Sequence, residues 1–91
     1  MIKTMTFTFH ADPGHGWLEV PFQMLQLLGI DGEITPYSYR RGATCYLEED
    51  QDAGTFLKAV QNHDGPLVEF EERNYNEDSF IRMMPRYTPT Q

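Results

Sequence analysis

Alternation of polar and apolar residues at the start of the chain predicts a β-strand. In residues 3–9, KTMTFTF, threonines alternate with methionine and phenylalanine, so the larger side chains share one face. The next stretch, ADPGHG, is typical of a tight turn, because Pro13 fixes φ and Gly14 tolerates positive φ. A second strand, WLEV, is predicted at residues 17–20.

Helical spacing of apolar residues follows at once. In PFQMLQLL, residues 21–28, apolar side chains recur every three or four positions, which is typical of an amphipathic helix. Pro21 suits the first helical position, where its missing N–H costs nothing. Gly29 suits a left-handed cap, so the helix is expected to end there.

The second half of the chain repeats this plan. EITPYSYR, residues 33–40, and TCYLEE, residues 44–49, are predicted strands joined by a turn. Asp50 is expected to cap a helix over residues 51–62, whose apolar residues fall on one face. PLVEFEE, residues 66–72, alternates as a last strand.

A weak internal duplication supports one fold class. WLEVPFQMLQLL, from Trp17, aligns with YLEEDQDAGTFL, from Tyr46, at an offset of 29 residues. Two such units and a closing strand give the order ββαββαβ. We therefore predict an α+β two-layer sandwich over residues 1–72, with a mostly antiparallel sheet and two helices on one face.

Residues 73–91 break the pattern and are predicted to form an irregular C-terminal tail. Two asparagines and two prolines prevent a long element, yet the tail holds an apolar cluster. The cluster comprises Phe80, Ile81, Met83 and Met84. These side chains either pack back across the domain or form an arm that reaches a second molecule, as in a homodimer.

Composition places the chain among single-domain globular proteins. Its 91 residues support one core, and 40% of them are hydrophobic. No apolar run of membrane-spanning length and no secretory signal pattern occurs, so we expect no membrane association and a cytoplasmic location. Cys45 has no cysteine partner, which fits a reducing compartment and the role of a small buried hydrophobe.

Negative charge is concentrated in one block. The net charge is −7, and residues 43–72 hold eight acidic residues against Lys58. Direct nucleic-acid binding is disfavoured, because phosphate contacts need clustered Lys or Arg. We expect instead an acidic face that binds a basic partner. The expected face comprises Glu48, Glu49, Asp50, Asp52, Glu69, Glu71 and Glu72.

The stretch HADPGHGW offers weak metal-ligand candidates in His10, Asp12 and His15. A fourth ligand would have to come from afar, for example Cys45. The simpler interpretation is a turn, in which Asp12 accepts backbone N–H bonds. Cys45 with either histidine matches no nucleophile signature, and no phosphate-binding loop occurs. We therefore expect no catalytic residues, metal or cofactor, and a protein that is not an enzyme.

DPGHGWLEV, followed by PYSYRRGATCYLEEDQDAGTFL, resembles a family of short uncharacterised proteins encoded by tailed phages and plasmids. The resemblance covers roughly residues 5–60. In that family YLEED is usually followed by CDAG, whereas this chain has Gln51 in place of the cysteine. The resemblance carries over no catalytic residue. It implies an accessory protein of a mobile element, expressed in the bacterial host cytoplasm.

Setting and charge together favour a non-enzymatic inhibitor. The expected partner is a host or defence protein with a basic surface, as for an anti-CRISPR or other anti-defence protein that acts as a nucleic-acid mimic. One alternative is a dimeric phage accessory or structural adaptor protein that uses the tail. Another is a small metal-dependent enzyme built on His10, Asp12 and His15.

Overall fold

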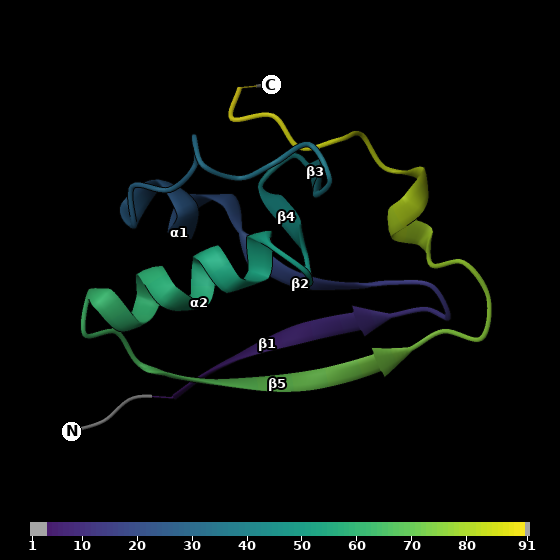
Figure 1. Ribbon diagram of the computed structural model, residues 1–91, viewed down its shortest axis with the longest axis horizontal. Helices are drawn as coiled ribbons and strands as arrows, with labels where there is room; N and C mark the ends of the chain where they lie inside the picture. The colour runs from purple at the N-terminus through teal and green to yellow at the C-terminus, as the bar shows by residue number, and fades with distance from the viewer. Residues whose placement is uncertain (1–3, 91) are drawn as a thin grey trace.

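The computed structural model describes residues 4–90 as a five-stranded sheet with two helices on one face (Figure 1). The predicted order ββαββαβ and the α+β class are confirmed. Lys3, which belongs to the first predicted strand, lies outside the described residues. The elements are β1 (Thr4–Ala11), β2 (Gly16–Pro21), α1 (Phe22–Leu27), β3 (Tyr39–Arg41), β4 (Thr44–Glu48), α2 (Asp52–Asn62), β5 (Leu67–Asn74) and a short 3-10 helix, η1 (Phe80–Met83).

The sheet has the strand order β3-β4-β2-β1-β5. Every neighbouring pair is antiparallel except β1 and β5, which run parallel from Thr4 opposite Leu67 to Ala11 opposite Asn74. The mostly antiparallel sheet is thus confirmed. β5 follows α2 and lies at the outer edge of the sheet, at the bottom of Figure 1.

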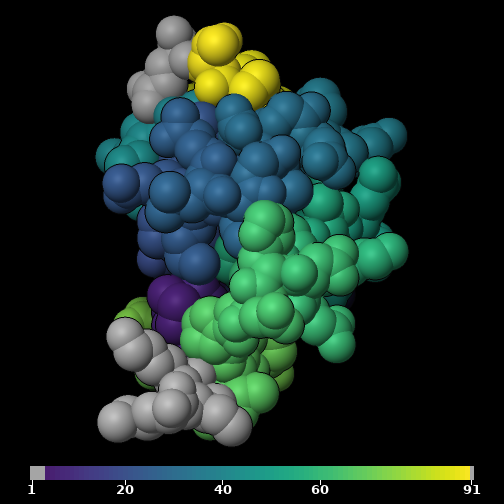
Figure 2. Space-filling view, turned by 90° about the vertical axis from the view of Figure 1, so that its left-hand side faces the viewer, coloured from purple at the N-terminus to yellow at the C-terminus, as the bar shows by residue number. Residues whose placement is uncertain are grey.

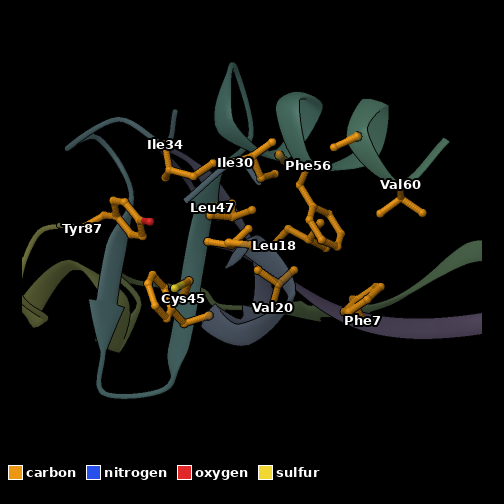
Figure 3. Packing of buried hydrophobic residues seen from close by; sticks show 14 residues of the cluster. Phe7, Leu18, Val20, Ile30, Ile34, Cys45, Leu47, Phe56, Val60 and Tyr87 are labelled. Carbon is orange, nitrogen blue, oxygen red and sulfur yellow. The ribbon is translucent and has the colours of Figure 1, made fainter. Parts of the chain in front are cut away.

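The main core lies between the sheet and the two helices (Figure 3). Strand residues such as Phe7 and Leu18 meet Leu25 of α1 and Phe56 of α2. The rings of Phe7 and Phe56 meet edge to face, with centroids 5.4 Å apart. Each such side chain contributes about 1.5–3 kcal/mol when buried. Figure 2 shows the α1 segment, in blue, packed beside α2, in green, at one end of the molecule.

Cys45 is fully buried in this core, as its expected role requires. Loss of hydration raises the pKa of its thiol to about 12. The thiol is therefore neutral at physiological pH. None of the helices within residues 4–90 has the length and apolar character needed to cross a membrane.

The predicted strand at residues 33–40 is much shorter than expected. Only its last two residues enter β3, Tyr39–Arg41. Pro36 has no N–H for a ladder, and the N–H and hydroxyl of Thr35 both donate to the carboxylate of Asp52. These bonds hold the segment against the start of α2 instead of in the sheet.

The start of α2 also differs from the prediction. Asp50 is not the N-cap, because the cap position falls on Gln51, whose side chain makes no capping bond. Asp52 lies in the first helical turn, as expected, but it is fully buried and accepts a 2.5 Å hydrogen bond from Ser38 Oγ. This carboxylate therefore accepts hydrogen bonds from the segment between the two helices and does not cap α2.

The segment after β5 covers part of the other face of the sheet. Ile81 is fully buried there with Trp17, Tyr39 and Tyr46. Further along, Tyr87 enters the main core. Residues 79–87 therefore pack back on their own chain, the first of the two arrangements predicted for the tail.

The candidate oligomer arm is divided by this packing. Ile81 is unavailable to a second molecule, because strands β2, β3 and β4 already bury it. Met84 is partly buried against the same cluster. Phe80 and Met83 remain exposed, at 45% and 88% of their surface. The four residues do not form one free apolar patch.

Candidate functional site

A pocket of about 540 Å³ opens on the sheet face that the helices leave free. Side-chain alternation explains its position, because Leu18 and Leu47 enter the core while the adjacent Trp17 and Glu48, which are paired across β2 and β4, point the other way. The lining residues are His15, Trp17, Tyr37, Tyr39, Glu48, Asp50, Gln51, Arg82 and Arg86.

A histidine and two carboxylates meet at one side of the pocket. His15 Nε2 lies 3.1 Å from Oε2 of Glu48, whose side chain is almost fully buried. The other oxygen of Glu48 accepts the N–H of Gln51 at 2.8 Å. Ligand atoms of His15, Glu48 and the exposed Asp50 all lie within 4.8 Å of one another. The arrangement can hold a proton or a cation.

Trp17 forms the floor of this site. Only 1% of its surface is exposed, and its ring centroid lies 5.4 Å from that of His15. The Arg82 guanidinium carbon lies 5.2 Å from the same ring. Within residues 4–90, the indole Nε1–H has no hydrogen-bond acceptor. Buried donors are paired in the great majority of cases, so this N–H is a notable exception.

Asp12 fixes the turn beside the pocket. Its Oδ1 accepts the N–H groups of Gly14 and His15, both at 3.0 Å, which confirms the predicted Asx-type turn. Its Oδ2 accepts the Ser79 N–H at 3.0 Å and Arg82 Nε at 2.7 Å. The bond from Arg82, followed by those backbone N–H groups, holds the pKa of Asp12 well below its ordinary value despite burial.

The structure gives the three weak metal candidates different side-chain partners. Asp12 is saturated by the bonds that hold the turn and the C-terminal segment. His10 is buried and bonds through Nδ1 to the Tyr75 hydroxyl and through Nε2 to Glu19, each at 2.8 Å. His15 alone faces the pocket. The expected ligand set is therefore not assembled.

The expected seven-residue acidic face is not one surface. Glu48 and Asp52 are buried. Their carboxylates are already hydrogen-bonded, that of Glu48 to His15 and that of Asp52 to Ser38 in the segment before β3. Alternation along β5 places Glu69 and Glu71 on the face away from the helices. The remaining three are exposed elsewhere, at the end of β4 and on the helix-facing side of β5: Glu49, Asp50 and Glu72.

A second depression, of about 380 Å³, lies between α2 and the strands β1, β2 and β5. Its walls are mainly apolar and include Phe9, Leu57 and Phe70. Glu49 and Glu72 line the same groove. Phe70 is 50% exposed, which is unusual for an aromatic residue on the helix-facing side of a sheet.

Sequence reasoning missed the pairing of His15 with Glu48 and the part played by Arg82. The signal for the His15–Glu48 pairing was the antiparallel pairing of the predicted strands WLEV and TCYLEE, which places Trp17 opposite Glu48. No local pattern pointed to Arg82, which lies seventy residues after its partner Asp12. Comparison of the sequence with family models, characterised proteins and solved structures gave no significant match.

Proposed function

We propose that the chain is a non-enzymatic binding protein that docks through the edge of β5 onto a protein with a basic surface. The observation that carries the proposal is a run of exposed carboxylates, Glu69, Glu71 and Glu72, on an edge strand. None of them takes part in an ion pair within residues 4–90. Their charge is therefore free to attract a cationic partner.

The apolar groove beside β5 supplies the contact area that charge alone lacks. Half-exposed Phe70 lines the groove together with Leu57, and Glu49 and Glu72 are among the other lining residues. Buried aromatic and apolar anchors dominate binding energy, whereas rim charges mainly set association rate and specificity. The groove suits a partner segment with one apolar anchor flanked by Lys or Arg. We call the groove and the free edge of β5 the β5 docking surface.

The setting implied by the resemblance makes a bacterial host or defence protein the expected partner. Occupation of its basic groove is the expected mode of inhibition. The docking surface follows both sides of a single strand, since Glu69 and Glu72 lie on opposite faces of the sheet. Contact along an edge strand therefore supports the proposal better than imitation of a continuous row of phosphates does.

The test is capture from bacterial lysate on immobilised wild-type protein, with three matched variants. Glu72→Lys and Phe70→Ser change the docking surface. Glu33→Lys makes the same charge change at an exposed site in the loop after α1. Exposed substitutions leave folding nearly unchanged, which circular dichroism verifies.

We expect one protein to be captured by the wild type and Glu33→Lys but not by Glu72→Lys or Phe70→Ser. The purified pair should then associate more slowly as salt is raised. If Glu72→Lys still captures the protein, or if the control Glu33→Lys loses capture as completely as Glu72→Lys does, the β5 docking surface is not used. An absence of any captured protein would also count against the proposal.

A further inference from the structure

We propose that His15, Glu48 and Asp50 form a binding site for a first-row divalent metal ion such as Zn²⁺. Their ligand atoms lie within 4.8 Å of one another at one side of the pocket. An imidazole nitrogen and two carboxylate oxygens are donors that zinc accepts at about 2.0–2.2 Å. The three donors lie on the opposite face of the sheet from the groove of the β5 docking surface, although Glu49 lies near both.

The spacing of the donors fits an ion with little movement. Two ligands of one zinc ion lie about 3–3.5 Å apart in tetrahedral geometry. His15 Nε2 and Glu48 Oε2 are already 3.1 Å apart. Asp50 is exposed, so its side chain is free to close the remaining distance.

A hydrogen bond holds one of the three donors in place, and a carboxylate lies behind a second. Glu48 is oriented by the Gln51 N–H, which bonds to the oxygen that does not face His15. His15 Nδ1, on the far side of the ring, lies 3.9 Å from Glu49 Oε1. A carboxylate behind a histidine and a hydrogen bond behind a carboxylate are the outer contacts that orient metal ligands.

Trp17 packs beside the three donors. Its ring lines the same pocket and packs against His15, yet its buried N–H has no acceptor within the described residues. A buried donor without a partner is destabilising unless water or a ligand supplies an acceptor.

The donor set also selects among metals. Mg²⁺ and Ca²⁺ prefer oxygen ligands throughout, whereas imidazole favours zinc and its first-row neighbours. We therefore expect zinc to bind in the presence of excess Mg²⁺. Co²⁺ should bind in the same place and show visible absorption bands that report its coordination.

The experiment is a titration of the full chain, purified without a histidine tag and stripped of metal, with Zn²⁺ in excess Mg²⁺. Calorimetry gives the stoichiometry and dissociation constant, and fluorescence of the single tryptophan, Trp17, reports binding beside His15. The variants are His15→Ala and Asp50→Asn. The matched control is Glu77→Gln, an exposed acid that does not line the pocket.

We expect one zinc ion per chain, a change in Trp17 fluorescence, and at least a tenfold rise in dissociation constant for both variants. Glu77→Gln should bind like the wild type. Absence of saturable zinc binding in excess Mg²⁺ would overturn the site. So would unchanged affinity in Asp50→Asn, a variant that keeps the fold because residue 50 is exposed.

Discussion

Replacement of Asp12 by asparagine tests how the turn holds the C-terminal segment. The asparagine carbonyl oxygen can still accept the N–H groups of Gly14 and His15, so the Asx-type turn survives. The amide nitrogen, however, takes the place of Oδ2 and faces two donors, the Ser79 N–H and Arg82 Nε. Asp12→Asn therefore leaves the Ser79 N–H without its acceptor and weakens the hold on the C-terminal segment, while the turn is kept.

The expected magnitude follows from the buried donor. Loss of the acceptor for the Ser79 N–H costs about 1–3 kcal/mol, because that group stays buried. Asp12→Ala also removes the two turn bonds, each worth about 0.5–1.5 kcal/mol. For a chain of this size, each kcal/mol lowers the Tm by about 4–8 °C. Asp12→Asn should thus be less stable than wild type, and Asp12→Ala less stable again.

The assay is urea unfolding followed by the fluorescence of Trp17, which lies against Arg82. Asp78→Asn is the control, because Asp78 also approaches Arg82, at 3.7 Å, but is almost fully exposed. Since the folded state lowers the pKa of Asp12, its stabilisation is complete above about pH 5 and is lost as pH falls through the unfolded-state pKa toward the lowered one. The gap between wild type and Asp12→Asn should therefore narrow between pH 5 and pH 2. Equal stability of Asp12→Asn and Asp78→Asn at pH 7, or a gap independent of pH, would refute this reasoning.

Three further outcomes are expected. A thiol reagent at pH 8 should modify Cys45 only after urea is added, because burial raises the pKa of this thiol to about 12. Rapid reaction of the native protein would show that Cys45 is accessible to solvent in the folded state. Ile81→Ala should lower the free energy of unfolding by about 2–5 kcal/mol, while Met83→Ala, at an exposed neighbour, should stay within about 0.5 kcal/mol of wild type in the same urea titration. Tyr87→Phe should cost about 0.5–1.5 kcal/mol through loss of the bond from its hydroxyl to the Asp31 carbonyl, and should remove from a spectrophotometric titration the tyrosine with a pKa of about 12; no change in either measurement would mean that this bond is absent in solution.

Elements with strong local periodicity were predictable from the sequence. Alternation around Phe7 and the helical spacing around Phe56 each describe one face of one element, and both faces enter the core. The Asx-type turn at Asp12 was predictable for the same reason, since its first two bonds lie within three residues.

Features set by distant parts of the chain were not predictable. Strand alternation correctly predicts that Glu48 lies on the opposite face of the sheet from Leu47. Its burial, however, depends on the residues around it in the folded pocket. Asp52 was expected on the surface, since nothing local reveals that Thr35 and Ser38 donate to it. The seven acids therefore form one block in the sequence but not one surface in space.

The parallel pairing of β1 with β5 has a consequence for how the chain folds. The paired residues lie 63 positions apart in the sequence, and such long-range pairing slows folding because a large loop must close first. On the ribosome, the strand with Phe7 emerges early but keeps a free edge until residues 67–74 are made. We therefore expect folding to finish only after synthesis of β5, in a single late step.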